Sequence, residues 1–137
     1  MAVTYLIDTD WAIDYLHKQP QVIAALEILR PMGLGISVIT VAELEIGVRR
    51  ARDRHAAQEG LENFLAPLVL FEVTRPICAL FAEWTVRLQQ RGESLDHFDV
   101  LIAATALHHH LTLCTNNRRH FERLEGLSLH SLLAEQG

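Results

Sequence analysis

Acidic and amide side chains follow the short apolar runs of this sequence, and they are the residues best suited to chemistry. Asp8 and Asp10 follow the first run, and Glu43 lies shortly after the second. Asp99 stands near the start of a long apolar segment, and Asn117 follows the next run. Carboxylate and amide oxygens are hard ligands that suit Mg²⁺ or Mn²⁺. No group of cysteines and histidines has the spacing of a zinc site.

The first three acids also have structural interpretations. Asp8 suits a turn after a strand, because an acid is poorly suited to burial in a sheet. Asp10 suits the N-cap of a helix that starts there, and we favour this over a role in metal binding. Glu43 lies three residues after Thr40, so the pair can form a capping box at a helix start.

Similar alternatives apply further along the chain. Asp96 can cap a helix in which Asp99 is a first-turn acid favoured by the helix dipole. Asn117 can be an ordinary turn residue. These interpretations do not account for the joint placement of the polar residues after successive apolar runs.

The elements that must position these residues alternate along the chain. Strands are predicted over residues 3–7, 35–39, 68–73, 111–115 and 127–130. Helices are predicted over residues 10–16, 20–30, 40–52, 55–65, 76–90 and 96–109. This alternation predicts a parallel sheet with helices on both faces. Ligands bind beyond the carboxyl ends of the strands in such folds, so the acids should meet at one edge of the sheet.

Length and composition restrict the class of protein. The 137 residues fit one domain, and half of them are apolar, which is enough for a real core. No apolar stretch approaches the length of a membrane span, and no basic leader precedes the first acid. We therefore expect a soluble, cytoplasmic protein. Cys78 and Cys114 cannot build a disulfide framework, and we expect both to be free, buried thiols.

The charge balance is unusual for a protein that binds nucleic acid. The net charge is −5, whereas phosphate contacts normally need a basic surface. Acids gathered around metal ions would resolve this conflict, because the ions reverse the local sign of charge. Arg49, Arg50, Arg52 and Arg54 suit a helix C-terminus, and they could equally contact RNA phosphates or an acidic partner.

Four segments of the chain form a distinctive series. They cover residues 5–10, 37–47, 99–107 and 111–121. In content, order and spacing they resemble the motifs of the PIN-domain family, and in particular those of VapC-type toxins from bacterial toxin–antitoxin pairs. The resemblance implies a single PIN domain over residues 1–137. It also implies a three-layer α/β/α fold with a central, mainly parallel sheet.

The resemblance further implies a metal-dependent endoribonuclease that hydrolyses RNA phosphodiester bonds. By motif position, Asp8, Glu43 and Asp99 would hold Mg²⁺ or Mn²⁺. The fourth position is often aspartate in PIN domains but is Asn117 here, so it either binds the metal directly or orients a water through its amide. Asp96 lies one turn before Asp99 and could supply some of the missing charge. We expect in-line attack by water, leaving a 5′-phosphate and a 3′-hydroxyl.

The resemblance also implies partners, namely an RNA substrate, a cognate antitoxin protein and a second copy in a homodimer, with no membrane. Three alternatives stay open. An aspartyl-phosphate phosphohydrolase would use Asp8 and Asp10, but Ala12 and Lys18 do not fit that family's pattern. A catalytically degenerate PIN domain could act as an interaction module, since Asn117 replaces an acid. A PIN nuclease could also serve in housekeeping RNA processing.

Overall fold

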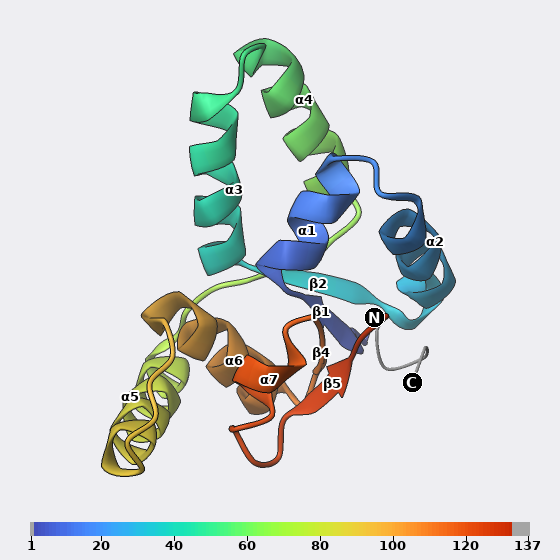
Figure 1. Cartoon of the computed structure of the whole chain (residues 1–137). Coiled ribbons are helices and arrows are strands. Elements are labelled where there is room, and N and C mark those ends of the chain that lie inside the picture. The colour runs from blue at the N-terminus through green and yellow to red at the C-terminus, as the bar shows by residue number, and fades with distance from the viewer. Residues whose placement is uncertain (1, 133–137) are drawn as a thin grey trace.

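A sheet of five parallel strands lies at the centre of the part of the chain that the structure describes, residues 2–132 of a computed structural model (Figure 1). The strands are β1 (Tyr5–Ile7), β2 (Leu34–Ser37), β3 (Val69–Phe71), β4 (Thr112–Cys114) and β5 (Ser128–His130). The helices are α1 (Thr9–Leu16), α2 (Pro20–Leu29), the 3₁₀ turn η1 (Arg30–Met32), α3 (Val38–Arg50), α4 (Arg54–Leu65), α5 (Arg75–Gln90), α6 (His97–His109) and α7 (Arg118–Phe121). The strand order β3-β2-β1-β4-β5 places β1 in the middle.

The strands send side chains into two hydrophobic cores, one on each face of the sheet. Ile7, Ile36 and Cys114 pack with residues of α1 to α4. Leu6 and Leu113 pack with residues of α5, α6 and α7. Successive residues of a strand point to opposite faces, so the same strands contribute to both cores. The predicted three-layer α/β/α architecture with a parallel sheet is confirmed.

Two helices on one face show how their sequences determine burial. α5 is amphipathic, and Ile77, Trp84 and Leu88 are buried at helical spacing. α6 is apolar almost all round, and residues from Val100 to Ala106 are largely buried against β4, α3 and α5. The start of α6 is therefore held firmly beside the sheet.

The carboxyl ends of β1, β2 and β4 lie at the same edge of the sheet. Ile7, the last residue of β1, is in register with Ile36 of β2 and Cys114 of β4. Asp8 and Thr115 therefore emerge side by side, and α3 begins next to them. β2 and β4 lie on opposite sides of β1, so the connections that leave the sheet diverge at the carboxyl end of β1. Parallel sheets of this kind bind ligands at such a point.

The start of α3 differs from the sequence prediction. The predicted strand over 35–39 ends at Ser37, whose Oγ accepts a hydrogen bond from the backbone N–H of Ile39 at 3.0 Å and so caps α3. Thr40 lies inside the helix, so the capping box that its spacing from Glu43 allows is not formed. Val38 and Ile39 are β-branched residues typical of strands, which explains the misplaced boundary.

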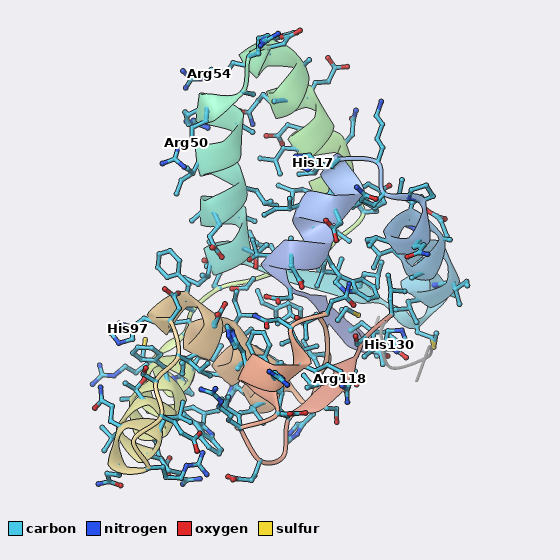
Figure 2. The ribbon with its side chains drawn as sticks, in the orientation of Figure 1. His17, Arg50, Arg54, His97, Arg118 and His130 are labelled. Carbon is cyan, nitrogen blue, oxygen red and sulfur yellow. The ribbon has the colours of Figure 1, made fainter. Side chains whose placement is uncertain are left out.

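α3 and α4 form an arm that projects from the sheet and turns at its far end (Figure 1). At this turn the Asp53 carboxylate accepts a hydrogen bond from the backbone N–H of Ala56 at 3.1 Å and caps α4. Arg50 and Arg54 lie at the tip and point outward (Figure 2). The tip is thus well solvated.

Cys78 and the helix α7 also differ from what the sequence predicted. Both cysteines are free, and Cys114 is buried as expected, but Cys78 is exposed on α5, so that prediction was wrong. The apolar residues around Cys78 include some that lie outside the buried face of α5, and Cys78 is one of them. The four-residue helix α7 was not predicted, because one helical turn leaves no periodic signal. Within residues 2–132, no helix is both long and apolar enough to cross a lipid bilayer.

Candidate functional site

Asp8 is the most deeply buried acid of the site, with 4% of its surface exposed. Its backbone N–H donates to the carbonyl of Cys114 at 3.0 Å, which fixes the residue between β1 and β4. Its Oδ2 accepts a hydrogen bond from the hydroxyl of Thr115 at 2.8 Å, while its buried Oδ1 has no hydrogen-bond partner in the described part of the chain. Burial, followed by the nearby Asp10 carboxylate, raises the pKa of Asp8 to about 8.

Asp10 faces the same edge and is not the N-cap that its sequence position suggested. α1 begins one residue earlier than predicted, and Asp8 occupies the N-cap position without a capping side-chain hydrogen bond. The Asp10 carboxylate accepts hydrogen bonds from the backbone N–H groups of Trp11 at 2.7 Å and Asn116 at 3.2 Å. Burial raises its pKa despite these two hydrogen bonds. The second bond ties α1 to the segment after β4.

Glu43 is held at this edge by Thr9 of α1, which in turn contacts Thr40 of α3. The hydroxyl of Thr9 donates to Oε1 of Glu43 at 2.7 Å, and it also lies 3.0 Å from the hydroxyl of Thr40. Thr40 is fully buried. Polar side chains therefore join α1 to α3 beside the carboxylate of Glu43.

Asp99 enters the site from the start of α6. One turn earlier, the carboxylate of Asp96 accepts a hydrogen bond from the backbone N–H of Phe98 at 2.9 Å, which confirms that Asp96 is the N-cap. The pKa of Asp99 is raised, first by burial and then by the negative charges of Asp96 and Glu43. The negative charge of Glu43 is therefore near enough to disfavour the ionised form of Asp99.

Asn117 lies on the β4 side of the cluster. Its backbone N–H donates to Oγ1 of Thr115 at 3.0 Å, and its side-chain Nδ2 lies 2.8 Å from Nδ1 of His120. The same histidine nitrogen is 3.9 Å from Oδ2 of Asp99. Asn117 thus contacts His120, which lies beside Asp99, and is tied to Asp8 through Thr115.

The sequence interpretation gave no role in the site to Thr9, Thr115 or His120, and it considered Thr40 only as part of a helix cap. Each lies just after a strand or within the first turns of the following helix. That position was the available signal, but only the carboxylates and the amide of Asn117 were followed to this edge. Hydroxyl groups matter here because they fix the orientation of the acids.

The residues present fit a divalent cation in their chemistry. All the acids offer hard oxygen ligands, and the unpartnered Oδ1 of Asp8 is a buried acceptor that lacks a positive or hydrogen-bonding partner. Burial and mutual repulsion raise the pKa values of Asp8 and Asp99, and a bound cation would oppose both effects. Across residues 2–132, however, no three metal-ligating side chains are gathered closely enough to hold an ion together.

A groove of about 800 Å³ runs between α1, α3 and α4, and Glu43 contributes to its lining. Most of the other lining side chains are apolar or small, including Leu44 and Val48 of α3. Gly47 and Gly60 also line it, and a Cβ atom at either glycine would meet nothing within 4 Å. The groove is therefore wide over these two helix positions and continuous with one acid of the cluster.

Comparison with known proteins agrees with this architecture. Residues 5–127 match the family described as the PIN domain. The chain is 31% identical to Ribonuclease VapC2 of Rickettsia felis, covering 91% of this chain and 95% of that protein. It is 32% identical to Ribonuclease VapC1 of Methanocaldococcus jannaschii, covering 90% and 83% of the two chains.

Solved structures show the same likeness. VapBC2 from Rickettsia felis, bound to a DNA fragment from its promoter, matches with a TM-score of 0.88 and 29% identity over 94% of this chain and 98% of that one. FitAcB from Neisseria gonorrhoeae matches with a TM-score of 0.80 and 27% identity over 92% and 96%. From the family match and the likeness to VapC proteins over nearly its whole length, the chain belongs to the PIN-domain family and is a VapC-like member of it.

Proposed function

We propose that this chain is a single PIN domain that acts in the cytoplasm as a metal-dependent endoribonuclease and is the toxin of a type II toxin–antitoxin pair. The observation that carries the proposal is the buried, unpartnered Oδ1 of Asp8, set among further acids at the carboxyl edge of a parallel sheet. The ribonuclease names of relatives that match over nearly the whole chain support the same reaction class.

In this proposal Asp8, Glu43 and Asp99 hold Mg²⁺ or Mn²⁺, and Asp96 adds negative charge beside Asp99. Such an ion supplies positive charge against the phosphodiester, lowers the pKa of water and stabilises the departing oxygen. The chain's own residues fix the geometry. Thr115 orients the Asp8 carboxylate by a 2.8 Å hydrogen bond, and Thr9 orients the Glu43 carboxylate by one of 2.7 Å.

Asn117 takes a separate part in the proposed reaction. Its amide sits beside the acids without adding a negative charge, so it can orient water or a phosphate oxygen without strengthening the repulsion among carboxylates. Its backbone is anchored to Thr115, the hydroxyl that also binds Asp8. The arrangement needs no nucleophilic side chain, since water attacks the phosphorus in line with the departing 3′ oxygen.

The direct test is RNA cleavage by the purified protein with and without divalent metal. Cleavage should require Mg²⁺ or Mn²⁺, stop in excess EDTA and leave fragments that carry 5′-phosphates. Sequencing the 5′ ends of fragments after induced expression identifies the RNA target. Cleavage that continues in excess EDTA would overturn the metal mechanism. A complete lack of cleavage and growth arrest would favour a PIN domain that acts only as an interaction module.

We also propose that the chain forms a homodimer and binds an antitoxin in the groove between α1, α3 and α4. Similar chains have been solved as VapBC and FitAcB complexes, and the groove offers an apolar surface that fits an amphipathic protein segment. The arginines from Arg49 to Arg54 lie at the far end of the arm that bounds it. Co-expression with the genomic neighbour should yield a copurifying small partner, and light scattering should give the mass of a dimer. A strictly monomeric protein with no such partner would contradict this proposal.

The two glycines in the groove support a close approach by the partner. A glycine inside a helix costs about 0.5–1 kcal/mol relative to alanine, and neither Gly47 nor Gly60 is required by contacts within the chain. Their absent side chains instead leave room on the groove surface. This is the arrangement expected where another backbone packs closely against α3 and α4.

A further inference from the structure

His120 lies between Asn117 and Asp99, two residues that belong to the proposed catalytic centre. Its Nδ1 is 2.8 Å from Nδ2 of Asn117 and 3.9 Å from Oδ2 of Asp99. His120 and Asn117 are three residues apart, on α7 and at its N-cap, so one helical turn brings their side chains together. The motif positions of the family resemblance assign no role to His120 in this chain.

The contact with the ring decides which end of the Asn117 amide is free. In the structure Nδ2 faces the ring and can donate to Nδ1, which requires the ring proton to be on Nε2. The amide oxygen is then the end that the ring does not engage. If the contact were lost, the amide could rotate and present its NH₂ group, which is a donor only.

Asn117 is anchored on its other side as well. Its backbone N–H donates to Oγ1 of Thr115, and that hydroxyl donates to Oδ2 of Asp8. The side chain of Asn117 therefore contacts His120, and its backbone is tied through Thr115 to the buried acid. With its backbone fixed by Thr115, the remaining freedom of Asn117 is the rotation of its side chain, and His120 restricts that rotation.

We propose that His120 is a positioning residue. It holds the amide of Asn117 so that the amide oxygen faces whatever cation or water the acidic cluster binds. An oxygen at that point is compatible with a cation or with the hydrogens of a water, whereas an NH₂ group would oppose a cation. His120 thereby allows an asparagine to supply this oxygen at a position where many PIN domains have an aspartate. The role in catalysis rests on the proposed function, while the coupling of the two side chains can be measured independently.

The test uses three variants of the full chain. Asparagine at position 120 places an acceptor near the position of Nδ1, glutamine places one near the position of Nε2, and alanine places none. We expect His120→Ala and His120→Gln to lower kcat for metal-dependent RNA cleavage by roughly tenfold to a hundredfold, as for other residues that orient metal-site groups. The KM for RNA should stay unchanged, and His120→Asn should recover most of the lost kcat. The side chain of His120 is 48% exposed, so all three variants should fold.

A second readout needs neither metal nor activity. The side-chain amide signals of Asn117, assigned in an NMR spectrum by their loss in Asn117→Ser, should show slowed hydrogen exchange in the wild type and in His120→Asn. The protection should disappear in His120→Ala and His120→Gln. Unchanged kcat in His120→Ala, or equal protection in all variants, would overturn the proposal.

The two readouts also separate this inference from the proposed nuclease function. If the wild type cleaves no RNA with Mg²⁺ or Mn²⁺, the nuclease proposal fails, and with it the catalytic role of His120. Loss of amide protection in His120→Ala and His120→Gln would still support the orienting contact. If the wild type cleaves RNA but His120→Gln is as active as His120→Asn, the positioning role alone is overturned.

Discussion

The carboxyl edge of the sheet and the tip of the α3–α4 arm both carry clustered charges, but they hold them differently. At the edge, Asp8 is almost wholly buried with one carboxylate oxygen unpartnered, and its pKa is raised to about 8. At the tip, Asp53 caps α4 while exposed to solvent, and Arg50 and Arg54 extend outward nearby. Charge at the tip follows ordinary helix chemistry, whereas charge at the edge destabilises the metal-free fold. Acids retained at such a cost indicate a site for something that neutralises them.

The largest expected difference between the two regions is in activity. Asp8→Asn should lower metal-dependent RNA cleavage by about a thousandfold or more, because several kcal/mol of charge stabilisation are lost with one ligand. Asp53→Asn at the arm tip should leave cleavage unchanged, since asparagine caps a helix as well as aspartate does. Rates of fragment formation at saturating Mg²⁺ check both. Full activity in Asp8→Asn would remove the distinction between the two regions.

The next effect is the pH dependence of stability in the metal-free protein. Asp8 ordinarily releases its proton near pH 3.8, but in the folded chain it keeps it to about pH 8. Between these values the folded state binds more protons than the unfolded state, so the free energy of unfolding should fall as pH rises. One such group contributes up to about 1.4 kcal/mol per pH unit.

Denaturant unfolding from pH 4 to pH 8 measures this slope. Asp8→Asn cannot titrate, so its stability relative to the wild type should improve steadily across the window. Asp53→Asn should show the slope of the wild type. Added Mg²⁺ should flatten the slope in the wild type, because it binds the ionised folded state. Parallel curves for wild type and Asp8→Asn without metal would show that Asp8 titrates normally.

A smaller contrast concerns one substitution in each region. Asp99→Asn should raise the melting temperature of the metal-free protein, because it removes a charge disfavoured by burial and by Asp96 and Glu43. Asp53→Ala should lower stability by about 1 kcal/mol through loss of a helix cap. Millimolar Mg²⁺ should stabilise Asp53→Ala as much as the wild type, and Asp99→Asn much less. A lower melting temperature for Asp99→Asn, with an undiminished Mg²⁺ shift, would assign Asp99 to the helix start alone.

The smallest effect is expected on the arm. Gly47→Ala should stabilise the isolated protein by about 0.5–1 kcal/mol, because the added Cβ meets no atom within 4 Å and alanine favours the helix. It should also weaken binding of the copurifying partner if that partner packs against this part of the groove. Thermal unfolding and a binding titration measure the two effects. An unaltered affinity would place the partner elsewhere.

The sequence predicted the succession of strands and helices along the chain better than the detailed geometry of the site. The parallel sheet and the gathering of polar residues at its carboxyl edge followed from alternating patterns and from the chemistry of strand ends. The capping roles considered for Asp10 and Thr40 belong instead to residues two and three positions earlier, because a cap at either place explains the same pattern. The part played by Thr115 was not predictable, since its bond to Asp8 depends on the register between β1 and β4.

His120 illustrates a further limit of sequence reasoning. Its contact with Asn117 depends on a single turn, α7, that has no periodic signature. Nothing in the local sequence indicates that Asp99, which comes from another helix, lies within 3.9 Å of the same ring. Short-range patterns predict helices and strands, whereas tertiary packing decides which side chains meet.

The hydrogen bond between Thr115 and Asp8 joins residues 107 positions apart, and this has a consequence for the order of events during synthesis. Chains emerge from the ribosome with the N-terminus first. Asp8 and Glu43 are made early, but β4 and Thr115 must follow before the central strand has both neighbours and the acid its hydroxyl partner. Closing so long a loop is slow relative to local folding. An unfinished chain that stops before β4 therefore lacks an assembled centre, so any activity of this site must wait until Thr115 has been synthesised and has joined Asp8.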